Sequence, residues 1–355
     1  MESHREVFGV NAFNFMKVCS YINTYNRTDT LLPMAILSIL NQTIKPQALI
    51  IFDENKEFKN PLENTTIKYL LDLSVEKGIP WFWLPGDKKG AHHNHEKANI
   101  MKDYDLFWFL DDDQVAQPDC LEKLLEEMRD GVGAVAGLIL KTPTKELIPG
   151  LDGTLKDVWS GQNLQWYRWS GDSKETEHLY SSFLYRGNIS HFDLRFSKKS
   201  FRCETQFTHS LFLKGYKLIV TPKAITWHFE GDGGCRSEEE EKSNLDMYNS
   251  DNKLFIDWLK TKQSGKKIYV LNGGVGDCYM FLQAIEPEPG SIIACCYPEC
   301  FDGKDVKIIS IAEAKMLVDD KDYDIYKWCH ENKWKGNLIG AYKALYTKMY
   351  ENFNR

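Results

Sequence analysis

Three consecutive carboxylates follow a run of large apolar residues: Phe107 to Leu110 lead directly into Asp111, Asp112 and Asp113. Adjacent anions repel one another, and burying one without a partner is costly. Mg²⁺ and Mn²⁺ prefer oxygen ligands of this kind and often share them with a substrate diphosphate. The pattern therefore predicts a divalent metal site at a strand end. The alternative is that these acids cap the helix that starts near Pro118.

Other polar residues follow predicted strands in the same way. Residues 23–27 come after the first strand, and Asp53 ends a short apolar run. In an open parallel sheet, ligands bind at the carboxyl ends of the strands. We therefore expect these side chains and the three acids to converge on one crevice.

The elements that must position these residues alternate between strand and helix. Apolar residues recur at helical spacing in 30–42, and short apolar runs bounded by turn residues indicate buried strands. This alternation predicts a parallel sheet in an α/β domain. The first predicted strand starts at Lys17, and the later strands cover 48–55, 80–86, 105–110 and 133–140. The predicted helices cover 30–42, 65–78, 93–104 and 117–131.

The periodicity weakens between Leu151 and Phe201, where 159–172 is aromatic, polar and glycine-bearing. We interpret this segment as loops that build an acceptor site or a lid. Residues 207–231 restore a helix, then a strand, then a turn after His228.

We predict three parts: a main domain over 1–235, a connecting helical segment over 236–262 and a small α/β accessory domain over 263–355. The last part contains a strand, a glycine turn at Gly273–Asp277 and a helix, followed by two further strands. The backbone of such a turn can bind phosphate.

The net charge and the cysteine content of the chain argue against some classes of function. The 355 residues carry a formal charge of −7, so the whole molecule has no basic footprint for non-specific nucleic-acid or acidic-membrane binding. Nine scattered cysteines indicate reduced thiols in a cytoplasmic protein, and Cys296 and Cys300 have no second pair at zinc-site spacing. With neither a signal peptide nor a membrane span in the sequence, we expect a soluble protein.

Three segments together resemble an inverting glycosyltransferase of family 2, which has the GT-A nucleotide-diphospho-sugar transferase fold. The strand, loop, helix and strand of 20–55 are similar to that family's opening. Residues 107–125 resemble its metal-binding Asp-x-Asp strand and the proline-started helix after it. Residues 203–228 resemble its base-bearing helix, Gly-Tyr turn and closing histidine. The Gly273–Asp277 turn weakly resembles a motif of heptosyltransferase-like enzymes, although the unit is only about half of such a domain.

The resemblance implies a nucleotide pocket lined by Thr24, Tyr25 and Arg27. Asp53 would bond the base, which in this family is usually uracil, so the implied donor is a UDP-sugar. One departure is Asp53-Glu54, where the family often has two aspartates.

The resemblance also implies a metal site. Asp113 would ligate Mn²⁺ or Mg²⁺, and His228 would approach the same ion. Asp111 would lie near the ribose or the metal's water shell, and Asp112 would belong to the same donor-binding set. The metal would stabilise the charge that develops on the departing diphosphate.

The catalytic base implied by the resemblance is Glu204, eleven residues before Gly215. The family usually has Glu-Asp where this chain has Cys203-Glu204. A single displacement needs one base and inverts the anomeric centre. Read without the family, Glu204 is a helix-start glutamate near the helix dipole, and His228 is a packed histidine.

A second departure lies in 90–99, where the family usually carries a small-Arg-Asn pattern. This segment instead contains His92, His93 and His95, and the first and last would share a helix face. They are either metal ligands or histidines that are exposed or contact the donor.

The sequence thus predicts a metal-dependent, inverting hexosyl- or pentosyltransferase without integral membrane contact. Its acceptor is a glycan or, by analogy with phage DNA modification, a hydroxymethylated DNA base in a host cytoplasm. One rival is a non-catalytic GT-A relic that binds nucleotide or glycan. A nucleotidyltransferase is a second rival, but residues 23–29 lack the glycine-rich basic loop expected of it.

Overall fold

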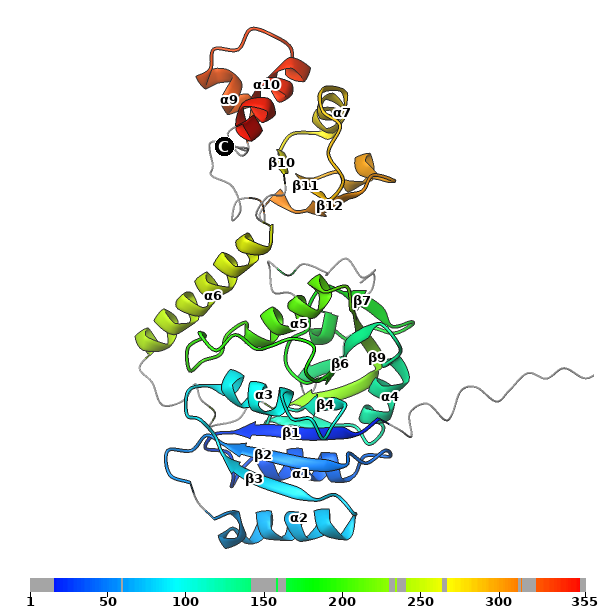
Figure 1. The fold of residues 1–355 in the computed structure, drawn as a ribbon, viewed down its shortest axis with the longest axis vertical. Coiled ribbons are helices and arrows are strands. Elements are labelled where there is room, and N and C mark those ends of the chain that lie inside the picture. The colour runs from blue at the N-terminus through cyan, green and yellow to red at the C-terminus, as the bar shows by residue number, and fades with distance from the viewer. Residues whose placement is uncertain are drawn as a thin grey trace, which may run out of the picture. The chain divides into compact units, whose positions relative to one another are not determined.

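The computed structural model divides the chain into two compact units, Met1–Phe255 and Ile256–Arg355, which are taken separately here. Figure 1 shows the elements of each unit. The structure describes residues 16–58, 60–141, 158, 164–229, 234, 241–263, 267–311, 314 and 324–351.

The first unit is built on one mixed sheet, as the predicted α/β class requires. Within the described residues the strands run in the order β3-β2-β1-β4-β8-β6-β9-β5, and β7 pairs with β9. β1, β2, β3 and β4 are mutually parallel. The bounds are β1 Val18–Thr24, β2 Ala48–Asp53, β3 Trp81–Pro85, β4 Leu106–Phe109, β5 Gln114–Ala116, β6 Val132–Lys141, β7 Lys174–Thr176, β8 Phe183–Arg186 and β9 Lys217–His228.

Helices cover both faces of this sheet because successive strand residues point to opposite sides. Leu49 and Ile51 of β2 pack in the cluster with α1, α2 and α4, whereas Ile50 and Phe52 pack in the cluster with α3 and α5. The helix bounds are α1 Leu32–Leu40, α2 Thr65–Glu76, α3 Ala91–Asn99, α4 Cys120–Glu127 and α5 Cys203–Leu213, with 3₁₀ turns at Pro61–Glu63 and Leu164–Trp166. A further helix, α6 Glu241–Gln263, contains the boundary between the two units.

The weakened periodicity over 151–201 conceals the strands β7 and β8, which the sequence pattern did not predict. β8 lies inside the sheet, antiparallel to both β4 and β6, with Phe107 opposite Tyr185 and Ala134 opposite the same tyrosine. β7 is a second strand in this stretch. β8 is only four residues long and follows two serines. A run this short shows no periodicity by which the sequence could distinguish a strand from a loop.

Parallel registers bring the polar strand ends together as predicted. Thr24 at the end of β1 pairs with Asp53 at the end of β2. Tyr21 of β1 pairs with Phe109 of β4. The three acids come just after β4, so they lie at the same edge of the sheet as the end of β1.

The second unit contains a three-stranded parallel sheet, as predicted. Its order is β10 Ile268–Leu271, β11 Ser291–Cys295 and β12 Val306–Ile309. Its helices are α7 Val275–Ala284, α9 Ile325–Glu331 and α10 Leu338–Glu351, with a 3₁₀ turn at Pro298–Phe301.

The glycine turn before α7 does not form an open phosphate site, because its backbone already binds the carboxylate of Asp277. Asp277 Oδ2 accepts from Gly274 N at 2.9 Å, and Oδ1 accepts from the Tyr326 and Tyr342 hydroxyls at 2.8 and 3.2 Å. A phosphate at this helix start would meet a buried anion. The heptosyltransferase likeness stays a prediction.

Two further findings bear on the setting of the protein. Among the helices that the structure describes, none combines the length and apolar character needed to cross a membrane. All eight cysteines within the described residues are free thiols.

Candidate active site

The positive charge that the three acids require comes from Arg27, on the loop after β1. Arg27 Nη1 lies 2.6 Å from Asp112 Oδ1 and 2.8 Å from Asp113 Oδ2, and all three side chains are largely buried. The backbone N–H of Tyr25 also donates to Asp112, at 3.3 Å. Charge-assisted hydrogen bonds of this kind offset the cost of burying the carboxylates.

Asp113 also meets His228, the last residue of β9. His228 Nε2 lies 3.4 Å from Asp113 Oδ2, and the Phe229 N–H donates to the Asp113 carbonyl at 2.8 Å. Antiparallel pairing of β5 with β9 sets this contact, because Gln114 lies opposite His228. The hydrogen bond to Asp113 raises the pKa of His228, although partial burial opposes it.

This oxygen and nitrogen pair fits a divalent ion. Ligand atoms about 2.1 Å from an octahedral ion lie about 3 Å apart, close to the separation of Asp113 Oδ2 and His228 Nε2. The Nδ1 atom of His228 is buried and has no hydrogen-bond partner within the described residues, so nothing in that part of the chain fixes the ring in a different role.

Asp111 is held by Gln114 of β5 and by two serines that directly precede β8. Its side chain accepts from the Ser181 hydroxyl, and from Gln114 Nε2 at 3.0 Å. Its backbone N–H donates to Ser182 Oγ at 3.2 Å. Burial and the neighbouring Asp113 raise the pKa of Asp111, with a smaller contribution from Glu204. Asp111 therefore lies within electrostatic reach of both Asp113 and Glu204.

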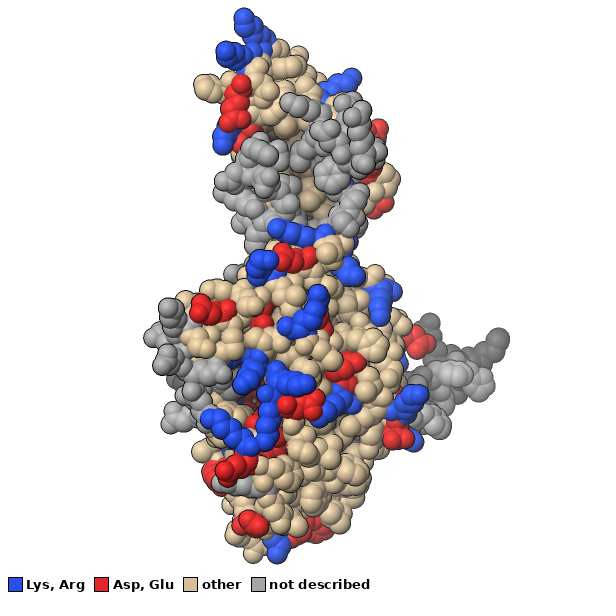
Figure 2. Space-filling model, turned by 60° about the vertical axis from the view of Figure 1, so that its left-hand side comes forward, with Lys and Arg blue, Asp and Glu red and all other residues tan. Residues whose placement is uncertain are grey.

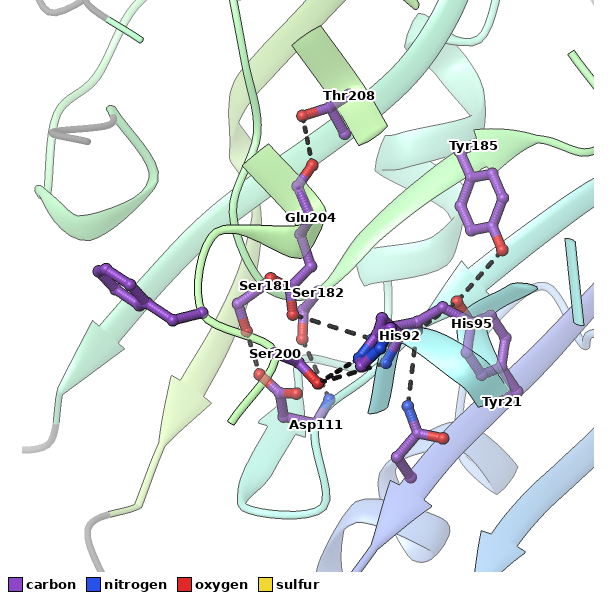
Figure 3. A network of polar contacts seen from close by, with 12 residues as sticks. Tyr21, His92, His95, Asp111, Ser181, Ser182, Tyr185, Ser200, Glu204 and Thr208 are labelled. Atoms are coloured by element: carbon purple, nitrogen blue, oxygen red, sulfur yellow. Dashed lines mark hydrogen bonds and ion pairs between the residues drawn. The ribbon is translucent and has the colours of Figure 1, made fainter. Parts of the chain in front are cut away.

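Glu204 lies in the first turn of α5, which starts after Arg202 in a left-handed conformation (φ 70°). Its carboxylate oxygen is 3.8 Å from His95 Nε2, and its side chain is 15% exposed. Figure 3 shows Glu204 between the serines around Asp111 and the α3 histidines. His95, Cys203 and Glu204 bring ligand-type atoms within 4.8 Å of one another.

The α3 histidines are not equivalent. His92 and His95 are fully buried, which corrects the expectation of exposed side chains for these two residues. His92 Nδ1 bonds Ser200 Oγ at 2.8 Å, whereas His93 lies 3.7 Å from Asp87. His92 is not in the potential metal-binding group found among the described residues, so the structure does not bring it with His95 to one ion.

The predicted base-binding Asp53 is buried at the end of β2. Its oxygens accept from Trp83 Nε1 at 3.2 Å and from Asn55 N at 2.9 Å. Glu54, which replaces the family's second aspartate, accepts from Asn94 Nδ2 at 2.5 Å. Asn94 belongs to the divergent 90–99 segment, so the two departures from the family pattern contact each other.

Sequence reasoning missed the residues that orient the acids. Gln114 donates to Asp111 and to Ser181, and its side-chain oxygen accepts from Thr226. Ser181 and Ser182 both have positive φ, at 48° and 30°. Serines and glutamines are common in any polar segment, and only the adjacency of Gln114 to the three acids was a usable signal.

Replacing Arg27 by alanine should destabilise the fold markedly. The change leaves Asp112, which is 8% exposed, without its cation, and breaking a buried pair costs about 3–5 kcal/mol. Denaturant unfolding monitored by circular dichroism would measure it. Arg129→Ala is the matched control: its side chain is 72% exposed beside Glu127, and its loss should cost less than about 1 kcal/mol. Equal stabilities for the two variants would contradict the role of Arg27.

The family model described as "Glycosyl transferase family 2" matches residues 21–169, a span that ends before Glu204 and His228. No curated protein matches the sequence.

Among solved structures, GalNAc-T7 with UDP, GalNAc and Mn²⁺ is similar at 14% identity and TM-score 0.48, with 61% of this chain and 44% of that one covered. The mannosyltransferase PcManGT from Pyrobaculum calidifontis, with GDP-Man and Mn²⁺, is similar at 12% identity and TM-score 0.46, with coverages of 71% and 65%. S. aureus TarS is similar at 9% identity and TM-score 0.45, with coverages of 94% and 55%. The chain thus spans about half to two thirds of these proteins.

The family match covers the strand ends that hold Arg27, Asp53 and the three acids, on a mixed sheet flanked by helices on both faces. Residues 21–169 are therefore similar to the glycosyltransferase family 2, and the mixed α/β sheet of the unit that contains them matches the arrangement of the GT-A fold.

Proposed function

We propose that the chain is a metal-dependent inverting glycosyltransferase that moves a hexosyl or pentosyl group from a UDP-sugar to an acceptor hydroxyl. The observation that carries the proposal is that Asp111 lies within electrostatic reach of both Asp113 and Glu204. This proximity supports a site in which Asp113 would be the metal ligand and Glu204 the base, although the two come from segments far apart in sequence.

We assign donor binding to residues at the strand ends. Asp53 would bond the base, and Thr24, Tyr25 and Arg27 would line the nucleotide. Asp113 and His228 would hold Mn²⁺ or Mg²⁺, which would supply electrostatic stabilisation of the departing diphosphate. The Arg27 guanidinium adds a fixed positive charge on the same side, already anchored by Asp112.

The acceptor end of the reaction falls to Glu204. Its carboxylate would take the proton of the acceptor hydroxyl while that oxygen forms a bond to the anomeric carbon. The bond from the anomeric carbon to the phosphate oxygen breaks at the same time, and its electron pair leaves with the nucleoside diphosphate. A single displacement of this kind inverts the configuration at the anomeric carbon and forms no covalent intermediate, so one carboxylate is sufficient.

We favour a glycan as the acceptor over a hydroxymethylated DNA base of the phage type. A DNA-binding face presents clustered Lys and Arg side chains to phosphates. On the face shown in Figure 2, basic side chains of the first unit are interspersed with acidic ones. The free cysteines support a reducing, cytoplasmic setting.

One observation favours the rival of a non-catalytic relic. Arg27 Nη1 lies 2.8 Å from Asp113 Oδ2, so the guanidinium already neutralises the carboxylate that we assign to the metal. A relic of this kind would bind nucleotide without needing a divalent ion.

The test is release of nucleoside diphosphate from a panel of sugar nucleotides, with and without Mn²⁺. We expect slow, metal-dependent hydrolysis of one donor, which identifies both donor and metal. Metal-independent nucleotide binding without any turnover would instead favour the relic.

A further inference from the structure

The histidine beside the proposed base has a side chain whose hydrogen-bonding atoms are strongly constrained. His95 is completely buried in α3. The Phe192 ring stacks on it at 5.1 Å, and Phe109 meets it edge-on at 4.3 Å. These contacts fix the plane of the imidazole, so its two nitrogens point in set directions.

The neighbours of Nδ1 determine which nitrogen of His95 carries the proton. Asn23 Nδ2, which can only donate, lies 3.5 Å from Nδ1, and the Tyr21 hydroxyl lies 2.9 Å from it. Tyr21 in turn contacts the Tyr185 hydroxyl at 3.2 Å. The Tyr21 hydroxyl can donate or accept, so the orientation of the Asn23 amide makes the assignment: with Nδ2 facing the ring, Nδ1 accepts and the proton of the neutral imidazole is on Nε2.

Burial and the nearby His92 lower the pKa of His95 to about 3, so the ring is neutral at ordinary pH. Its Nε2–H has no hydrogen-bond partner within the described residues. The carboxylate of Glu204, at 3.8 Å, faces it. An orphaned buried N–H is costly, and a short approach of Glu204 would satisfy it.

From this geometry we infer that His95 is a positioning residue for Glu204: its Nε2–H holds one carboxylate oxygen and leaves the other to receive the acceptor proton. The inference rests on the proposed function. The chain Tyr185–Tyr21–His95–Glu204 runs from β8 and β1 through α3 to α5, and Figure 3 shows its members together.

A metal bound by His95, Cys203 and Glu204 is the competing reading of the same atoms. It would need a bare lone pair on Nε2, which the contacts of Nδ1 oppose. It would also need a thiolate, and burial together with the adjacent carboxylate raises the pKa of Cys203 well above its ordinary value. The Cys203 sulfur lies within 4.8 Å of a Glu204 carboxylate oxygen, and this neighbouring carboxylate favours the protonated thiol.

The dependence of rate on pH should report this role. The groups that act on Glu204 are His95 from α3, Cys203 from α5, Asp111 after β4 and Tyr21 from β1. A donor stabilises the ionised carboxylate, so without His95 the base is protonated more readily. When the pH is lowered, a variant without His95 should therefore lose its activity at a higher pH than the native chain does.

The experiment measures nucleoside diphosphate release by two variants. His95→Leu replaces the imidazole with an apolar side chain of similar size, and His95→Gln has an amide that can still donate. We expect His95→Leu to lower kcat about 10-fold with little change in the donor KM, and to move the acid limb of the rate profile up by about one pH unit. His95→Gln should recover part of both effects. Tyr346→Phe, which removes a buried hydroxyl in the second unit, is the control and should change neither.

Two results would overturn the inference while the native enzyme is active. One is an unaltered kcat and pH profile in His95→Leu; the other is an equal loss in the leucine and glutamine variants. A native chain that releases no nucleoside diphosphate would sink the proposed function itself. Independently of turnover, ¹⁵N spectra of the His95 ring should show a protonated Nε2 that shifts in Glu204→Gln; a protonated Nδ1 would refute the contact.

Discussion

Glu204→Gln should reduce sugar transfer by about 10²- to 10⁴-fold while leaving donor binding nearly unchanged. The amide has the size of the carboxylate but cannot accept the acceptor's proton, and a positioned general base contributes a factor of this order. Because we assign Glu204 to the acceptor and not to the donor, the loss should appear in kcat and not in the donor Kd. Transfer assays with the identified donor, together with calorimetric titration of the nucleotide, would separate the two quantities.

Glu175→Gln is the matched control, because it makes the same chemical change at a side chain that is 53% exposed and pairs with Lys217 at the surface. It should retain full activity. Transfer by Glu204→Gln at the native rate would exclude Glu204 as the base and return it to a helix-start glutamate.

Asp113→Asn should abolish the response of the enzyme to Mn²⁺ and lower kcat by about 10²- to 10³-fold, because a neutral amide is a much weaker ligand and loses the electrostatic help to the departing diphosphate. The contact with His228 Nε2 at 3.4 Å should then no longer suffice to hold the ion. Activity measured as a function of Mn²⁺ concentration checks this: the native chain should saturate, whereas the variant should stay flat.

Asp130→Asn, an exposed aspartate at the end of the α4 segment, is the control and should keep the native metal response. Full activity of Asp113→Asn without added metal would contradict the metal role. In that case Arg27, which lies 2.8 Å from the same carboxylate, would be the cation that serves the diphosphate.

Local pattern was sufficient to predict much of the first unit. Strand–helix alternation indicated the parallel half of the sheet, and the structure has β1, β2, β3 and β4 parallel, with Thr24 beside Asp53. Periodicity reports which face of an element is buried, and in this half each strand is long and apolar enough to show it. The prediction that polar strand ends converge followed from topology alone.

The antiparallel half of the sheet could not be predicted in the same way. β8 has four residues, and its place between β4 and β6 depends on pairing with strands about fifty to eighty residues away in sequence. Such contacts leave no periodic trace in a short segment. The serines before β8, which hold Asp111, were therefore unreadable as site residues.

Sequence pattern was sufficient to pick out the candidate residue types: acids after a buried strand, a glutamate at the start of a helix and a histidine at the end of the last strand. The partners of these residues became visible only in the folded chain. Arg27 reaches Asp112 and Asp113 across 85 and 86 positions, and His95 meets Glu204 across 109, because loops and strand pairing, not local propensity, set those distances. The physical reason is that side-chain chemistry is local, whereas burial, charge pairing and the tautomer of a histidine depend on whatever the fold places next to it.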